Sequence, residues 1–223
     1  INKKDILKNI NKIKGLMFHF NCENDDAKNL EKSFNYIGAK YGEILKKLEW
    51  VSFGGGIYFT KKGYDLKKFI SLLKNFSGRY GVQIYLEPGE SSITNSAQLH
   101  TTVLDVIKNG KNIAIIDAST EAHMLDLLIY NTPAKINTDK KNKYEYIVAG
   151  RSCLAGDVFG TYKFKKPLKI GDNIVISDVA GYTMVKKNWF NGLPMPAIAV
   201  KRLNGKTEII RRFDYTDFKK NLS

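Results

Sequence analysis

The sequence predicts an α/β unit followed by a mainly antiparallel β unit. Before residue 92, three apolar runs with strand character alternate with helical patterns, and polar residues or glycine follow each run. A helix that returns the chain between two strands is typical of a parallel sheet. After residue 92, short strand patterns separated by turn residues replace the helices. We therefore expect two domains, residues 1–92 and residues 93–223.

The helices of the first half are predicted by apolar residues that recur every three or four positions and so share one helix face. Such patterns begin near Ile6, extend from Leu30 to Leu48, and extend again from Leu66 to Phe76. The predicted strands are residues 15–20, 50–53 and 82–86. In parallel α/β folds the C-terminal ends of the strands commonly carry the chemistry.

The second half is predicted to begin with a hairpin. Asn109-Gly110 lies between strand patterns at residues 99–108 and 112–117, and this dipeptide is a strong short-range hairpin signal. Residues 132–145 are polar and are predicted as a loop. Further strands are predicted at residues 146–149, 162–164, 173–178, 197–202 and 208–213.

The net charge of +14 over 223 residues raises the question of an anionic partner. The lysines are scattered rather than gathered in a stripe with interleaved aromatic residues, so we interpret the charge as solvated surface and expect no nucleic-acid partner. No apolar run approaches the ~18 residues of a membrane span. The two cysteines, Cys22 and Cys153, have no zinc-ligand spacing and are too few for a disulfide framework. We expect a cytoplasmic chain without a metal site or membrane association.

Candidate functional residues follow the predicted strands of the first half, namely His19, Gly54-Gly55-Gly56 and Glu87. Consecutive glycines expose backbone N–H groups that can bind phosphate, although a tight turn would use them equally well. A carboxylate such as Glu87 can pair with the cationic ring nitrogen of pyridoxal phosphate, and a surface-loop glutamate is the alternative. His19 could stack on a planar cofactor or be a core histidine.

The second half offers a thiol and a carboxylate four residues apart, Cys153 and Asp157, in a loop that contains glycine. A cysteine in a polar loop can act as an acid or a nucleophile, and a structural free cysteine is the alternative. Tyr182 could donate its hydroxyl to an anion or pack against neighbours.

Together and in this order, these motifs resemble the fold-type III, alanine-racemase-like pyridoxal-phosphate decarboxylases. The motifs are Phe53-Gly54-Gly55-Gly56, Leu86-Glu87-Pro88-Gly89-Glu90, Cys153-Leu154-Ala155-Gly156-Asp157, Gly181-Tyr182-Thr183 and Phe190-Asn191-Gly192. The similarity is greatest to the carboxynorspermidine/carboxyspermidine decarboxylase branch. That branch is indicated by His19 with Cys22-Glu23, Asp117-Ala118-Ser119, Ala122-His123-Met124 and Tyr182-Thr183-Met184-Val185-Lys186. The resemblance implies the C-terminal part of a pyridoxal-phosphate-binding (β/α)8 barrel followed by a mainly antiparallel β domain.

The resemblance also implies a cofactor site for pyridoxal 5'-phosphate. His19 would lie against the pyridine ring, and Glu87 would pair with the ring nitrogen. Gly54, Gly55 and Gly56 would surround the phosphate, and Tyr182 would hydrogen-bond to it. Cys153 would enter the site from the partner subunit of a homodimer and return a proton to the α-carbon after decarboxylation.

The implied substrate is a carboxylated polyamine. Glu90 stands where related ornithine enzymes have arginine, so a phosphate-binding cation is replaced by a carboxylate that could bind a substrate ammonium. Asp126 would be a second such anchor and Asp157 a third. The alternatives are a decarboxylase of ornithine, lysine or diaminopimelate. Diaminopimelate would call for an arginine at its distal carboxylate, which the acidic pair of Glu90 and Asp126 does not provide.

The family's Schiff-base lysine lies on the first barrel strand, and the three predicted strands here look like the last three of eight. Ile1 is not methionine, so we do not expect it to be the true start of the gene product. Either an N-terminal part with that lysine precedes Ile1, or the gene is truncated. Ala39-Lys40 resembles the lysine's sequence context, but Lys40 lies within a strongly periodic helical pattern and is not a candidate. A non-catalytic fragment or a basic binding module is the alternative from a different functional class.

Overall fold

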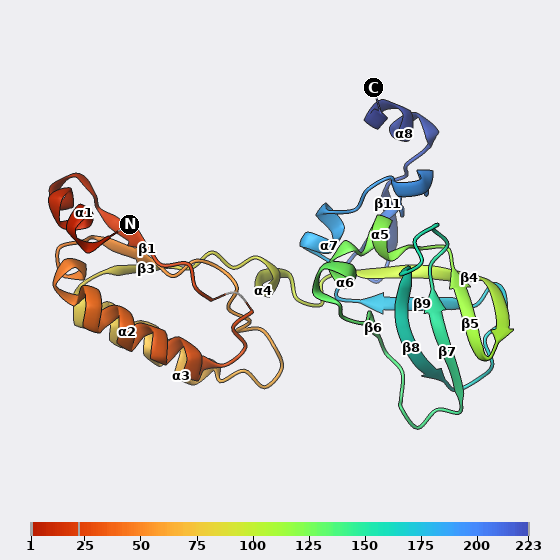
Figure 1. The fold of residues 1–223 in the computed structure, drawn as a ribbon, viewed down its shortest axis with the longest axis horizontal. Helices are drawn as coiled ribbons and strands as arrows, with labels where there is room; N and C mark the ends of the chain where they lie inside the picture. Colours follow the sequence, from red (N-terminus) through yellow and green to blue (C-terminus); the bar gives the residue numbers. More distant parts are fainter. Residues whose placement is uncertain (1, 22, 223) are drawn as a thin grey trace. The chain divides into compact units, whose positions relative to one another are not determined.

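The computed structural model describes residues 2–21 and 23–222, so Cys22 lies outside the described residues. The chain divides into two compact units, residues 1–94 and residues 95–223, which are called unit 1 and unit 2 below (Figure 1). The sequence pattern places the change of texture near residue 92. Among the described residues, no helix combines the length and the apolar character that crossing a membrane requires.

Unit 1 contains a parallel sheet in the order β1-β2-β3, as the sequence predicts. Its strands are β1 (Gly15–Met17), β2 (Trp50–Ser52) and β3 (Gln83–Tyr85). The long helices between them are α2 (Ala27–Leu45) and α3 (Leu66–Tyr80), and the short elements are α1 (Lys3–Lys8), η1 (Ile10–Lys12) and α4 (Glu90–Ile93). Figure 1 shows α2 and α3 side by side along the sheet. Along the chain, α2 connects β1 to β2, and α3 connects β2 to β3.

The two long helices of unit 1 are capped by residues that satisfy some of their terminal backbone groups. Asp26 accepts a hydrogen bond from the backbone N–H of Lys28 at 2.8 Å and caps α2. Asp65 caps α3 in the same way, and Gly81 ends that helix in the left-handed conformation with a φ of 68°. The apolar faces of both helices form the core. Its fully buried members include Leu30, Leu45, Val51 and Phe53.

Unit 2 is built on a six-stranded sheet in the order β6-β9-β4-β5-β7-β8. Its strands are β4 (Gln98–Asn109), β5 (Lys111–Ile116), β6 (Lys135–Ile136), β7 (Tyr144–Ala149), β8 (Val158–Phe164) and β9 (Asn173–Ser177). A separate antiparallel pair consists of β10 (Ile198–Lys201) and β11 (Thr207–Arg211). The prediction of a mainly antiparallel β domain is confirmed, and the exception is the parallel pair of β5 and β7.

The predicted hairpin is present. Asn109 and Lys111 face each other across the turn, and Gly110 has a φ of 67°, which an L side chain disfavours. Strand β4 pairs with β9 in its first part and with β5 in its second part. The fully buried side chains of the core come from the inner faces of these strands and include Val103, Ile116, Val148, Phe159 and Ile176.

The predicted loop at residues 132–145 is partly wrong, because it contains the two-residue strand β6 and the first residues of β7. The sequence patterns also miss the helices of unit 2. These are α5 (Thr120–His123), α6 (Leu125–Tyr130), α7 (Tyr182–Val185), η2 (Phe190–Gly192) and α8 (Tyr215–Leu222). Most span one or two turns, which is too short for an apolar residue to recur on one face.

Candidate active site

In unit 1 the residues that follow the parallel strands lie close together. The backbone N–H of Phe18 donates to Ser52 O at 2.8 Å, and that of Phe53 donates to Tyr85 O at 3.1 Å, so pairing continues to the strand ends. A Cβ atom added to Gly54 would lie 2.2 Å from His19 Nδ1. The imidazole therefore packs directly on the Gly54 backbone, and position 54 must be glycine for this contact.

The glycine run approaches the next strand end equally closely. The Glu87 N–H donates to Gly54 O at 2.9 Å, and a Cβ atom on Gly55 would lie 2.4 Å from Glu87 O. Gly54 and Gly56 have φ values of 68° and 80°, which glycine adopts without strain. Within the described residues, no hydrogen bond uses the backbone N–H of Gly55 or Gly56. Two backbone donors are thus available where consecutive parallel strands end.

The Glu87 carboxylate is fixed by a residue that the sequence analysis did not single out. The Ser52 hydroxyl donates to Glu87 Oε1 at 2.6 Å and accepts from the Gly54 N–H at 3.1 Å. Ser52 is buried, whereas Glu87 is exposed. One hydroxyl therefore orients both the carboxylate and the start of the glycine run. The signal in the sequence was a serine at the last position of a strand, directly before Phe53-Gly54-Gly55-Gly56.

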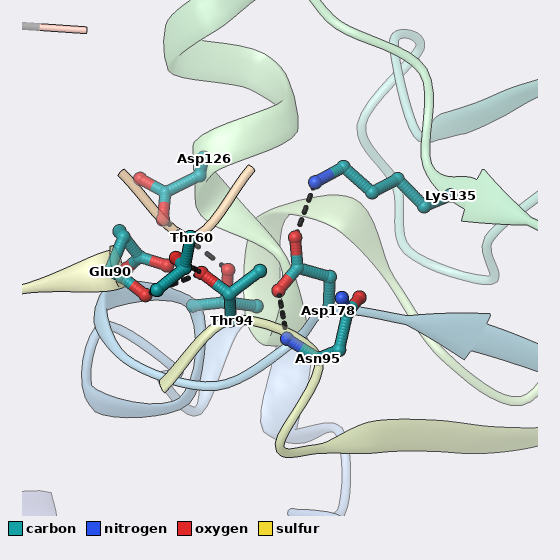
Figure 2. Close-up of polar contacts among 8 residues, drawn as sticks. Thr60, Glu90, Thr94, Asn95, Asp126, Lys135 and Asp178 are labelled. Atoms are coloured by element: carbon teal, nitrogen blue, oxygen red, sulfur yellow. Dashed lines mark hydrogen bonds and ion pairs between the residues drawn. The ribbon is translucent and has the colours of Figure 1, made fainter. Parts of the chain in front are cut away.

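Glu90 opens the short helix α4, close to the end of unit 1. Thr94 Oγ1 donates to the Glu90 carbonyl at 3.0 Å, and Thr60 Oγ1 donates to the Ser91 carbonyl at 2.8 Å (Figure 2). The Thr60 and Thr94 hydroxyls are 2.8 Å apart. These contacts tie the backbone that carries Glu90 to the loop after β2, so the carboxylate belongs to an anchored segment. Asn95 is the first residue of unit 2, and its N–H donates to Asp178 Oδ1 at 2.9 Å (Figure 2).

In unit 2, Asp126 and Tyr182 share a common neighbour, Lys186. The Lys186 ammonium lies 2.5 Å from Asp126 Oδ1 and 5.0 Å from the centre of the Tyr182 ring. Thr183 Oγ1 is 3.4 Å from the other Asp126 oxygen. The hydrogen bond to Asp126 raises the pKa of Lys186. Carboxylate, hydroxyl and aromatic face together form surroundings that suit an alkylammonium group.

Cys153 and Asp157 belong to one loop, residues 150–157, between β7 and β8, but their surroundings differ. Cys153 is exposed, and its backbone N–H donates to Asn191 Oδ1 at 2.9 Å. Asp157 is 4% exposed, and its carboxylate accepts hydrogen bonds from Thr120 and Ser152. The predicted role of Asp157 as a substrate anchor is therefore corrected. A buried carboxylate with both oxygens engaged has no free lone pairs for an ammonium.

The residues of unit 1 fit pyridoxal phosphate by their chemistry. Adjacent backbone donors at Gly55 and Gly56 suit a phosphate, and the exposed Glu87 carboxylate suits a cationic ring nitrogen. Ser52 was not among the residues predicted from the sequence, and Lys186 and Asn191 appeared only within quoted motifs, without a role of their own. Each acts on a predicted residue from a distant position in the chain, which periodicity does not reveal.

The chain is similar to proteins of known family. Residues 20–180 match the model described as "Pyridoxal-dependent decarboxylase, C-terminal sheet domain". A carboxynorspermidine/carboxyspermidine decarboxylase of Herminiimonas arsenicoxydans is 48% identical over 98% of this chain and 60% of its own length. The Campylobacter jejuni protein of the same name is 44% identical over 94% of this chain and 58% of its own length. The chain thus spans less than two thirds of each relative. A carboxyaminopropylagmatine decarboxylase of Synechocystis is 35% identical over 94% of this chain and 55% of its own length.

Solved structures agree in fold. The crystal structure of carboxynorspermidine decarboxylase complexed with norspermidine from Campylobacter jejuni superposes with a TM-score of 0.91 and 42% identity, covering 99% of this chain and 64% of that one. The structure of diaminopimelate decarboxylase from Helicobacter pylori superposes with a TM-score of 0.81, covering 98% of this chain and 59% of that one. Its sequence is 22% identical, so this similarity concerns the fold alone. The match over residues 20–180, with parallel strands and glycine run in unit 1 and the sheet in unit 2, shows that the chain belongs to the pyridoxal-dependent decarboxylase family.

Proposed function

We propose that this protein catalyses the pyridoxal-phosphate-dependent decarboxylation of carboxynorspermidine or carboxyspermidine to norspermidine or spermidine in polyamine biosynthesis. The observation that carries the proposal is the grouping of His19, Gly54–Gly56 and Glu87 at the ends of neighbouring parallel strands. The names of the relatives that are 48% and 44% identical support the choice of substrate. A cytoplasmic location stays a prediction from the low cysteine content.

In this proposal the chain binds the cofactor through groups of different chemistry. The N–H groups of Gly55 and Gly56 bind the phosphate, and the Tyr182 hydroxyl adds a further donor. Glu87, oriented by Ser52, pairs with the ring nitrogen and keeps it protonated. The bound pyridoxal phosphate supplies the electron sink that stabilises the negative charge left on the α-carbon when carbon dioxide leaves.

The proton that replaces carbon dioxide comes from Cys153. Its position on an exposed loop suits a residue that completes a site in a second subunit, as the family resemblance implies. The thiol donates its proton to the α-carbon and takes it up again from solvent before the next turnover. We therefore propose a homodimer with shared active sites.

Substrate recognition rests on carboxylates. The ion pair between Asp126 and the Lys186 ammonium supports a role for Asp126 in binding an alkylammonium group. Glu90 contributes a second carboxylate on an anchored backbone. Charge-assisted hydrogen bonds from two carboxylates suit a substrate with several ammonium groups. The distal carboxylate of diaminopimelate would instead be repelled by both.

Turnover of a substrate panel by the full-length protein tests the proposal. Carboxynorspermidine, carboxyspermidine, carboxyaminopropylagmatine, ornithine, lysine and diaminopimelate are compared by carbon dioxide release in the presence of pyridoxal phosphate. We expect kcat/KM for a carboxylated polyamine to exceed that for diaminopimelate by at least about a hundredfold, since the Glu90 and Asp126 carboxylates would repel the distal carboxylate of diaminopimelate. Preference for diaminopimelate, lysine or ornithine would contradict the substrate assignment. Absence of any visible absorbance change with added pyridoxal phosphate would instead favour a non-catalytic protein.

A further inference from the structure

The loop that carries Cys153 is held from inside by a single buried carboxylate. Asp157 Oδ1 accepts from the Thr120 N–H at 2.7 Å and from the Thr120 hydroxyl at 2.9 Å. Asp157 Oδ2 accepts from the Ser152 N–H at 3.0 Å and from the Ser152 hydroxyl at 2.6 Å. Ser152 directly precedes Cys153, so the carboxylate joins the cysteine loop to the first turn of α5.

Gly150 allows the carboxylate to take this position. A Cβ atom on Gly150 would lie 2.3 Å from each Asp157 carboxylate oxygen. The Gly150 N–H also donates to the Asp157 carbonyl at 2.8 Å and closes the base of the loop. Any side chain at position 150 would displace the carboxylate, which indicates that the close approach is a specific feature of this loop.

The tip of the loop is held from outside by Asn191. Its Oδ1 atom accepts from the Cys153 N–H at 2.9 Å. Asn191 has a φ of 57°, a left-handed conformation that asparagine adopts more readily than most residues. Among the described residues, the Cys153 backbone N–H donates to Asn191 alone. The Asn191 side chain therefore fixes the backbone at Cys153 directly.

The two contacts are connected through α5. Asn188, three residues before Asn191, donates from its N–H to Ala122 O at 2.8 Å and from Nδ2 to Glu121 O at 2.9 Å. Its Oδ1 atom accepts from the Phe190 N–H at 2.8 Å. The segment that carries Asn191 is thus tied to the same short helix that Asp157 binds at Thr120. Hydrogen bonds and short chain segments thus link the Cys153 backbone through Asn191, α5 and Asp157 back to Ser152.

We propose that Asp157 and Asn191 are positioning residues that fix the Cys153 loop in the conformation from which the thiol protonates the α-carbon. This inference rests on the proposed function, because it assumes that Cys153 is the proton donor. Neither residue needs to touch the substrate. Their contribution is to hold an exposed loop in one conformation before the substrate binds, which lowers the entropic cost of placing the donor.

The test compares Asn191→Gly with Asn131→Gly in the full-length holoenzyme. Glycine keeps the left-handed backbone and removes the side chain, so Asn191→Gly deletes the contact to Cys153 with little strain. Asn131 is also left-handed, with a φ of 49°, and ends α6, so its replacement is a matched control. Asp157→Asn is a second variant that leaves the Ser152 or Thr120 N–H groups without an acceptor.

Two readouts separate positioning from folding. Hydrogen exchange of the peptide that contains Cys153 should become about five- to tenfold faster in Asn191→Gly, as expected for the loss of one hydrogen bond, and should not change in Asn131→Gly. Rapid-quench turnover with carboxynorspermidine then compares carbon dioxide release with polyamine formation. Because the thiol acts after carbon dioxide leaves, a displaced thiol should delay polyamine formation alone.

The wild-type protein and Cys153→Ala provide the reference points. We expect the two products to form together in the wild type, and polyamine to lag in Cys153→Ala, in Asn191→Gly and in Asp157→Asn if this last variant folds. Faster exchange in Asn191→Gly without a lag, while Cys153→Ala does show one, would refute the positioning role and leave the proposed function intact. A Cys153→Ala variant without a lag would refute the role of Cys153 itself and with it this inference.

Discussion

Replacing Ser52 with alanine should weaken the binding of pyridoxal phosphate, although Ser52 is buried and is not proposed to touch the cofactor. The Ser52 hydroxyl donates to Glu87 at 2.6 Å and accepts from the Gly54 N–H at 3.1 Å. Its removal leaves Glu87 free to rotate into solvent and leaves a buried backbone donor without its acceptor. Both the carboxylate and the glycine run of the proposed cofactor site lose their support.

The expected size follows from these two hydrogen bonds. A hydrogen bond to a charged group contributes about 1.5–3 kcal/mol, and the lower end applies because Glu87 is exposed and water competes. About 1.5 kcal/mol corresponds to about a tenfold rise in the Kd of the cofactor. The unsatisfied Gly54 N–H costs a further ~1–3 kcal/mol of stability. In a domain of about 150–250 residues, each kcal/mol of lost stability lowers Tm by about 2–4 °C.

The assay is a titration of the full-length apoprotein with pyridoxal phosphate, followed by absorbance, together with the Tm of each variant. Ser77→Ala is the matched control, because the Ser77 hydroxyl donates to the Val82 carbonyl at 2.7 Å, before β3 begins rather than after it ends. We expect Ser77→Ala to lower Tm without changing the Kd. Equal cofactor affinity in the Ser52→Ala variant and the wild type, with a lowered Tm, would refute the idea that Ser52 positions Glu87.

Three further predictions concern the substrate and the effect of pH. Glu90→Gln should lower kcat/KM for carboxynorspermidine by about tenfold or more through loss of a charge-assisted contact, with an unchanged Kd for pyridoxal phosphate. If the affinity for pyridoxal phosphate fell as much as kcat/KM, the role of Glu90 in substrate binding would be contradicted. Lys186→Met should lower the KM of the polyamine substrate, because Lys186 occupies Asp126; a raised KM measured in steady-state kinetics would show that the ion pair is structural. Burial lowers the pKa of His123 below 6.5, and its Nδ1 atom accepts from the Ser119 N–H at 3.1 Å, so the folded state keeps the imidazole neutral. As the pH falls, the unfolded state therefore takes up a proton at His123 before the folded state does, and Tm should fall below about pH 6.5. The His123→Asn variant should show a smaller fall of Tm in this pH range. The same fall of Tm in the variant and the wild type would contradict the role of His123.

Local patterns in the sequence predicted much of the fold. The three parallel strands and the two long helices of unit 1 lie where the apolar spacing predicts them, and Lys40 lies inside α2 as expected. The hairpin at Asn109-Gly110 is equally local, since the turn requires only a left-handed glycine. The short helices α5 and α7 were missed because four residues cannot establish a helical period.

The candidate site was predicted as a set of residues, whereas its contacts were not. Hydrogen bonds join Ser52 to Glu87 across 35 positions and Thr120 to Asp157 across 37. Lys186 and Asp126 are 60 positions apart. No sequence period encodes such pairs. The hydrogen bonds that bury the Asp157 carboxylate beneath its loop were therefore not foreseen, and Asp157 was predicted as a substrate ligand.

By itself, the sequence determined the order of strands and long helices in unit 1, the hairpin turn of unit 2 and the polar residues at strand ends, because each depends on neighbours within a few positions. Only the tertiary structure decided which of these side chains are engaged with one another. Burial and hydrogen bonding depend on segments that folding brings together. The same carboxylate chemistry therefore leaves Glu87 exposed at a strand end and encloses Asp157 beneath the cysteine loop.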